Sequence, residues 1–200
     1  VSPQSARVFI IGQGASKQVR QSQAGLRLDY RPRHGRASSL TLYGVDRALK
    51  NPIPGRIVEL DRSAFGLRSE HEFALADWRV TTGFDLDTQR DERREFGNEG
   101  LPDGISVDDE RVFDQVQYGA GQIDQEEKVR SFGPFLSLEK DLGTALILTL
   151  AGRYDRYRFA VTDRLATDGR APGGRDMDQF SPMAGLVYRP SPLTRLYAHI

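Results

Sequence analysis

The segment from Val8 to Lys17 comes closest to a chemical motif. It reads VFIIGQGASK, an apolar run followed by Gly12 and Gly14, and a dinucleotide-binding loop begins in the same way. Such a loop also needs a third glycine and a helix whose N-terminus faces the pyrophosphate. No third glycine and no amphipathic helical pattern follow here, and the spacing of a phosphate-binding GxxxxGK loop is absent. The pattern is therefore typical of a connection between strands.

Histidines and acidic residues are the next candidates for chemistry. His34, His71 and His199 lie far apart, whereas metal ligands are clustered or share a helical spacing. The acidic run Asp108 to Glu110 lacks the ligand spacing of a calcium loop. No GxSxG sequence supports a serine nucleophile, although a serine pair assembled only in space stays open. We predict no metal, no cofactor and no catalytic residue.

Strands with a period of two are the elements that must position any site. In Trp78 to Asp87, one face carries Trp78, Val80, Thr82, Phe84 and Leu86, and the other carries Arg79, Thr81, Gly83, Asp85 and Asp87. The run Gly143 to Tyr154, GTALILTLAGRY, alternates as strictly. The pattern predicts nine strands: Ala6–Gly12, one ending at Tyr30, Ser38–Val45, Ser63–Phe73, Trp78–Asp87, Val129–Glu139, Thr144–Phe159, Phe180–Arg189, and one from Thr194 onward.

The connections between these strands alternate in length. Short turns are expected at Arg31–Arg36, Ala74–Asp77, Lys140–Gly143 and Pro190–Leu193. Long connections are expected at Gln13–Arg20, Asp46–Arg62, Thr88–Lys128 and Ala160–Gln179. Long strands with short turns at one end and long loops at the other are typical of an outer-membrane β-barrel. A Greek-key sandwich does not require this alternation.

Composition narrows the function classes. Lys and Arg number 28, as do Asp and Glu, so no net field favours nucleic acid. The sequence contains no run of about 18 apolar residues, so no membrane-spanning helix is predicted. Cysteine is absent, which fits the cytosol as well as an oxidising compartment.

A membrane-crossing strand needs about 9–11 residues, and Thr144–Phe159 is long enough. Leu146, Leu148 and Leu150 would face lipid and Tyr154 would lie near the headgroups. The other face, with Ala145, Thr149, Ala151, Arg153 and Asp155, would line a wet interior. Pro134 and Pro182 remove ladder donors inside predicted strands, so we expect both near a rim or a bulge.

Local patterns in the last third of the chain add a family resemblance. Gly152–Tyr157 reads GRYDRY, and Phe180–Pro190 reads FSPMAGLVYRP and is followed by Leu196, Tyr197 and Ala198. Together with LKNPIPGR at Leu49–Arg56, this succession resembles the barrel of TonB-dependent outer-membrane receptors, especially those for ferric siderophores.

The resemblance implies an all-β, antiparallel, up-and-down transmembrane barrel of 22 strands that encloses an N-terminal plug. Residues 1–200 would be an internal part of the barrel domain without the plug, because nine strands cannot close a bacterial barrel. The implied function is import of a scarce ligand across the outer membrane of a Gram-negative bacterium, with a ferric siderophore, lipid and, through the plug, TonB as partners. The alternatives are a porin-like or enzymatic outer-membrane barrel and a soluble β-sheet binding domain.

Candidate ligand contacts lie in the two longest connections, Thr88–Lys128 and Ala160–Gln179. Arginine and aromatic side chains can bind an anionic, aromatic iron chelate by charge and stacking. The candidates of these types are Arg90, Arg93, Arg94, Phe96, Arg111, Phe113 and Tyr118.

Overall fold

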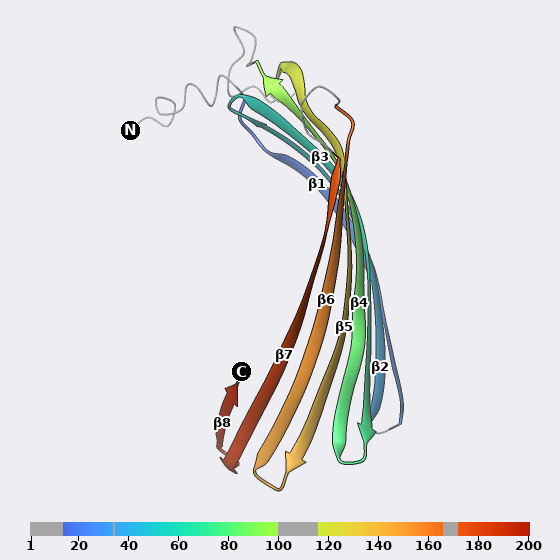
Figure 1. The fold of residues 1–200 in the computed structure, drawn as a ribbon, viewed down its shortest axis with the longest axis vertical. Coiled ribbons are helices and arrows are strands. Elements are labelled where there is room, and N and C mark those ends of the chain that lie inside the picture. Colours follow the sequence, from blue (N-terminus) through green and yellow to red (C-terminus); the bar gives the residue numbers. More distant parts are fainter. Residues whose placement is uncertain (1–13, 34, 100–115, 166–171) are drawn as a thin grey trace, which may run out of the picture.

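A single antiparallel sheet makes up the fold in the computed structural model, which describes residues 14–33, 35–99, 116–165 and 172–200. Each strand pairs with its sequence neighbours, so the order is β1 to β8 without a crossover (Figure 1). The strands are β1 Gln18–Arg33, β2 Arg36–Ile53, β3 Arg56–Leu75, β4 Trp78–Asn98, β5 Tyr118–Leu142, β6 Leu146–Asp163, β7 Gly173–Ser191 and β8 Thr194–His199. This all-β, up-and-down meander confirms the predicted fold class.

Eight of the nine predicted strands are present, and the strand expected at Ala6–Gly12 lies outside the described residues. Several are much longer than predicted. β2 and β3 form one continuous hairpin, with register running from Arg36 paired with Phe73 to Ile53 paired with Arg56. The prediction of a long connection at Asp46–Arg62 is therefore wrong. In that stretch both faces carry polar residues, so hydropathy does not reveal the strand although the backbone ladder continues.

Short turns join the strands at the lower end of Figure 1, where they were predicted, and the strand ends that the two longest connections join lie at the upper end. These two connections span residues 99–117 and 164–172. Both are shorter than predicted, because β4 and β5 extend toward the first and β6 and β7 extend toward the second. At the upper end β2 and β3 are joined by Pro54 and Gly55 alone. Gly55 has a φ of +77°, a backbone conformation that residues other than glycine rarely adopt.

Pro134 and Pro182 lie within strands and not at a rim or a register shift, so that expectation is wrong. Pro134 pairs with Phe84 in an unbroken β4–β5 register. The β5–β6 pairs stop at Phe132 and resume at Phe135 in the same register, so the interruption at the proline lies on the β6 side. Pro182 pairs with Gly152, above the level that β8 reaches in its pairing with β7. A proline is tolerated where the missing donor would not have completed a ladder bond.

The sheet is one layer thick, and few of its large apolar side chains are buried. The buried apolar residues among those described are Ile57, Val80, Val116, Ile123 and Ile147. At the upper end, where the strands bend over, Ile57 and Pro52 are buried beside the Phe96–Tyr118 ring pair. The described residues contain no helix long and apolar enough to cross a membrane. A soluble sheet of this size would need a second layer over its apolar face.

Candidate functional site

One face of the sheet carries a continuous apolar band, which we call the outer face. Residues paired across antiparallel strands share a face, so the register assigns each side chain. The band consists of Leu26, Leu28, Tyr30, Leu40, Leu42, Phe65, Leu67, Phe73, Trp78, Val80, Phe84, Leu86, Phe132, Leu136, Leu138, Leu146, Leu148, Leu150, Tyr154, Phe180, Ala184, Leu186, Tyr188 and Leu196. Many are exposed, for example Leu26 at 54%.

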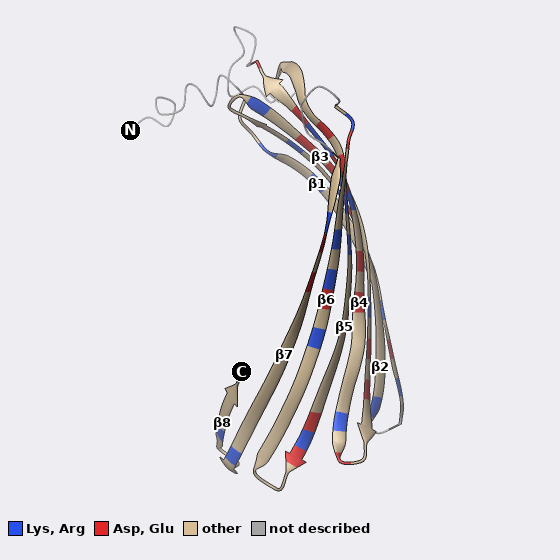
Figure 2. Cartoon of the chain, viewed as in Figure 1, with Lys and Arg blue, Asp and Glu red and all other residues tan. Residues whose placement is uncertain are grey.

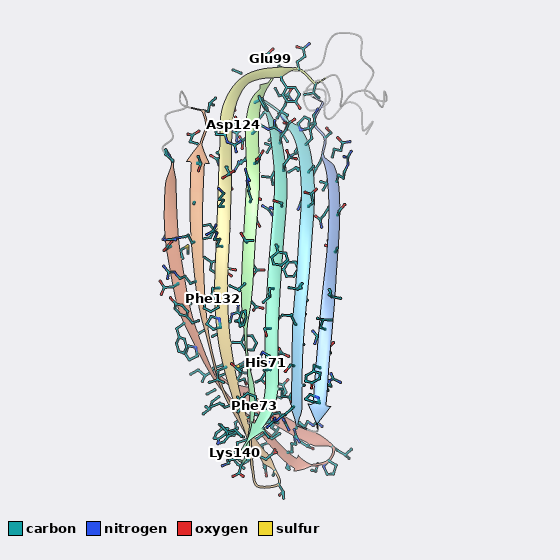
Figure 3. The ribbon with its side chains drawn as sticks, turned by 90° about the vertical axis from the view of Figure 1, so that its right-hand side faces the viewer. His71, Phe73, Glu99, Asp124, Phe132 and Lys140 are labelled. Atoms are coloured by element: carbon teal, nitrogen blue, oxygen red, sulfur yellow. The ribbon has the colours of Figure 1, made fainter. Side chains whose placement is uncertain are left out.

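The apolar band occupies the lower part of the sheet. Figure 2 shows long uncharged segments in the lower halves of β6 and β7, with charged residues above them. In Figure 3, Phe132 lies at mid-height, Lys140 at the bottom and Asp124 far above on the same strand, β5. From Trp78 to Leu86 the band rises about 20 Å at ~3.3 Å per residue and a tilt near 40°. This height fits the hydrocarbon region of an outer membrane, so the lipid-facing assignment of the leucines agrees with the fold.

The inner face carries an acidic column along β4, formed by Asp85, Asp87, Asp91 and Glu95. These residues are spaced by two or four, so all of them point to the same face. Each of these carboxylates pairs with an arginine or accepts a hydrogen bond from a hydroxyl group on a neighbouring strand. The inner face is therefore a dense polar surface with its charges compensated, as expected for the wall of a water-filled lumen.

Arg153 on β6 reaches across β5 to the acidic column. Its Nη1 lies 2.7 Å from Asp85 Oδ2 and its Nε donates to Asp155 Oδ1 at 2.8 Å. Arg68 on β3 approaches the same Asp85 carboxylate at 3.4 Å. A Cβ added to Gly133, which lies between β4 and β6, would overlap the Arg153 guanidinium. Glycine is thus needed on β5 because the arginine crosses the backbone there.

Tyr43 makes a similar crossing from the other side. Its hydroxyl donates to Asp87, while Ser131 Oγ donates to the second carboxylate oxygen at 3.1 Å. The tyrosine ring lies over Gly66 on β3, where an added Cβ would overlap the ring. Tyr43 and Arg153 therefore approach neighbouring carboxylates of β4 from opposite directions.

Higher on the column the carboxylates are more deeply buried. Asp91 is 2% exposed and accepts two bonds from Arg62, at 2.8 and 2.7 Å, and a third from Gln89 at 2.9 Å. Glu95 is 1% exposed and pairs with Arg56 at 2.9 Å and with Arg93 Nε at 2.9 Å. The bond to Asp91 raises the pKa of Arg62. Beside these groups, a groove of about 340 Å³ is lined by Tyr43, Arg47, Arg62, Asp87 and Gln89 among others.

The predicted ligand contacts divide between the two faces of the sheet. Arg93 faces inward, whereas Arg90, Arg94 and Phe96 lie on the outer face of β4, above the apolar band. Tyr118 begins β5, where its hydroxyl donates to Glu59 at 2.5 Å. Arg111 and Phe113 lie outside the described residues. The structure therefore places five of the seven in strands, not in a loop, and does not gather them at one point.

The outward-facing members of this set have local partners. Arg94 lies 3.4 Å from both Glu59 and Asp61, and Arg90 pairs with Glu126. Phe96 packs edge-on against Tyr118, with ring centroids 5.1 Å apart.

The inner-face network was not singled out from sequence, although part of its signal was present. The alternation in Trp78–Asp87 already places Asp85 and Asp87 on one face, and that in Thr144–Phe159 places Arg153 on the inner face. Their meeting depends on the register between β4, β5 and β6, which no local pattern contains. Among the described residues no group of three or more His, Asp or Glu is arranged to hold a metal. His71 instead contacts Ser38 and Ser69, at 2.9 and 3.0 Å.

A meandering antiparallel sheet with an apolar outer face, a polar inner face and short turns at one end is the wall of a transmembrane β-barrel. Residues 11–199 match the family model described as TonB dependent receptor-like, beta-barrel. The chain belongs to this family of TonB-dependent receptor barrels, which confirms the predicted family. Its members are receptors and transporters, in agreement with the prediction that the chain is not an enzyme.

Several solved structures share this fold. The ferric citrate transporter FecA is 12% identical with a TM-score of 0.68, over 92% of this chain and 27% of that chain. The siderophore receptor PiuA from Acinetobacter baumannii is 12% identical with a TM-score of 0.63, over 92% and 32%. The alcaligin outer membrane receptor FauA from Bordetella pertussis is 13% identical with a TM-score of 0.65, over 92% and 28%.

At these identities the likeness establishes the fold alone. This chain spans roughly 27–32% of the length of those three proteins. No curated protein matches the sequence.

Proposed function

We propose that this chain forms part of the barrel wall of an outer-membrane receptor that captures a ferric siderophore and imports it with energy supplied through TonB. The observation that carries the proposal is the polar inner face beneath the two longest connections. A ligand that enters at that end would meet the Arg62–Asp91 and Arg93–Glu95 pairs and then the Tyr43–Asp87 and Arg153–Asp85 pairs.

Membership of a receptor family supports this role, and the similar structures include a ferric citrate transporter, a siderophore receptor and a ferric-catecholate import receptor. On this proposal the protein lies in the outer membrane of a Gram-negative bacterium, with the two longest connections outside the cell. Contact with TonB would be made by residues of the receptor beyond these 200.

We assign first contact with the ligand to the connection between β4 and β5, which spans residues 99–117. Connections longer than about 12–15 residues are commonly functional. This one contains Arg111 and Phe113, whose side chains suit an anionic aromatic chelate. Arg90, Arg94 and Phe96 already have partners on the outer face, so Arg93 is the β4 candidate that faces the lumen.

The test replaces residues 101–115 in the complete receptor by a Gly/Ser linker of equal length, which leaves β4 and β5 intact. A matched control uses the same linker but retains Arg111 and Phe113. Surface display and binding of a panel of ferric siderophores are then measured on whole cells. We expect normal display of both variants, weakened binding by the full replacement and partial recovery in the control. Unchanged affinity in the full replacement would remove this connection from the mechanism.

A further inference from the structure

Directly above the apolar band, the outer face of β4, β5 and β6 carries five cationic side chains. We call this cluster the basic patch: Arg90, Lys128, Arg130, Arg156 and Arg158. The last outer residues of the band below it are Leu86, Phe132 and Tyr154. The basic patch therefore begins where the apolar surface ends.

Like charges face each other within the basic patch. Arg90 is paired across the ladder with Lys128, and Arg130 is paired with Arg158 two residues further along β5. Directly opposed like charges on one face of a sheet are unfavourable. A sheet surface that contains two such pairs in succession would be stabilised by an external anion.

The carboxylates nearby compensate only part of this charge. Glu92, on the same face of β4, accepts a hydrogen bond from Arg90 at 3.2 Å. Glu126 forms ion pairs with both Arg90 and Lys128, and Arg164 lies 3.4 Å from the same carboxylate. Asp176 accepts from Arg156 at 3.0 Å and from Arg158 at 3.1 Å, and Asp178 is paired across the ladder with Arg156. The side chain of Arg130 has no hydrogen bond or ion pair to any residue in the described part of the chain.

Asp176 and Glu126 are both ionised at neutral pH, so each accepts hydrogen bonds from the cations of the basic patch and donates none. Hydrogen bonds from Arg156 and Arg158 lower the pKa of Asp176, and the bond from Lys128 lowers that of Glu126. The cations remain accessible, with Arg158 67% and Arg90 52% exposed.

We propose that the basic patch binds the phosphate groups of an anionic lipid in the leaflet that the apolar band contacts. Position and charge together select this occupant. The acyl chains would lie against Phe132, Tyr154 and their neighbours, while Arg130 and Arg158 reach the headgroup phosphates just above them. Arginine forks suit phosphate oxygens, and a lipid bearing two phosphates would satisfy both opposed pairs at once. This inference rests on the membrane location given under the proposed function.

The test uses the complete receptor with Arg130→Gln and Arg158→Gln combined. The control combines Arg20→Gln and Arg175→Gln, which remove the same charge from exposed positions on β1 and β7 that have no ion pair in the described structure. Each protein is refolded in detergent and titrated with diphosphoryl lipid A, monophosphoryl lipid A, phosphatidylglycerol, phosphatidylcholine and inorganic phosphate. Native mass spectrometry counts the bound molecules.

We expect the native receptor and the control to bind diphosphoryl lipid A in preference to phosphatidylcholine. The patch variant should bind diphosphoryl lipid A more weakly by on the order of tenfold. Equal affinity of the patch variant and the control would overturn the proposal. Binding of inorganic phosphate as tight as that of the lipid would also overturn it, because the apolar band would then contribute nothing.

A separate measurement distinguishes failure of this inference from failure of the proposed function. Insertion of the native receptor into phosphatidylcholine vesicles is followed by protection from protease. Insertion without preference for phosphorylated lipid overturns the basic patch alone. Absence of insertion overturns the membrane location and the patch together.

Discussion

At the scale of single residues, glycines determine which side chains cross the inner face. Tyr43 and Arg153 reach carboxylates on β4 only because Gly66 and Gly133 leave the intervening backbone bare. From sequence, a glycine inside a strand indicates a close approach but not its partner, because the partner comes from another strand. The charged members of this network could be assigned to a face, whereas their pairing could not be predicted.

Gly66→Ala should destabilise the barrel by about 1–3 kcal/mol, because the new methyl group displaces the Tyr43 ring and breaks its bond to Asp87. Gly185→Ala, where the nearest atom lies 3.8 Å from an added Cβ, is the matched control and should cost much less. Tyr43→Ala in the Gly66→Ala background removes the clash, so the two changes should be strongly non-additive. Urea unfolding in lipid vesicles compares five proteins: the native barrel, Gly66→Ala, Tyr43→Ala, the double variant and the Gly185→Ala control. Additive costs would show that the ring and the glycine do not interact.

At the scale of elements, strands are recognisable from sequence only where their two faces differ in polarity. In Trp78–Asp87 and Thr144–Phe159 an apolar face alternates with a polar face, and the register agrees with the predicted faces of both segments. The upper parts of β2 to β5 have charges on both faces, such as Arg94 with Asp61 outside and Arg56 with Glu95 inside. Their extended conformation is fixed by cross-strand ladders and ion pairs between distant segments, so local patterns suggested loops there.

The two faces of β6 should differ in their tolerance of charge. Leu150, 40% exposed in the apolar band, faces lipid, so Leu150→Arg should destabilise the folded barrel by about 2–4 kcal/mol near the bilayer midplane. The neighbouring Thr149→Arg places the same side chain on the inner face, where water and the carboxylate of Glu139 on the paired strand are nearby. Its cost should be far smaller. Folding titrations in vesicles compare the two variants, and the reverse order would mean that the faces are assigned the wrong way round.

At the scale of the whole molecule, the described sheet is an open wall. β1 and the six-residue β8 each pair on one side only within the part that the structure describes. An open sheet edge is not tolerated in lipid, because unpaired backbone groups find no water there. The wall therefore needs further strands before it can cross a membrane, and the known structures that share its fold are about three times its length.

The 200-residue chain expressed by itself should not be a water-soluble monomer. Its apolar band and the free edges of β1 and β8 would both be exposed to water. Size-exclusion chromatography and near-UV circular dichroism without detergent test this expectation. We expect aggregates without cooperative melting. A monodisperse monomer with a sharp transition would instead favour a soluble β-sheet domain.

The length of β4 sets the distance between the membrane surface and the upper end of the sheet. The strand continues about twelve residues past Leu86 to Asn98. At ~3.3 Å per residue and a tilt near 40° this lifts its tip by at most about 30 Å above the hydrocarbon, because the strands bend over at this end. The Debye length at physiological ionic strength is about 8 Å. A negatively charged solute that meets the rim at that height is several screening lengths from the phosphates of the bilayer. The stiff hairpin would thus act as an electrostatic spacer, which lets an anion dock without first overcoming repulsion from the membrane itself.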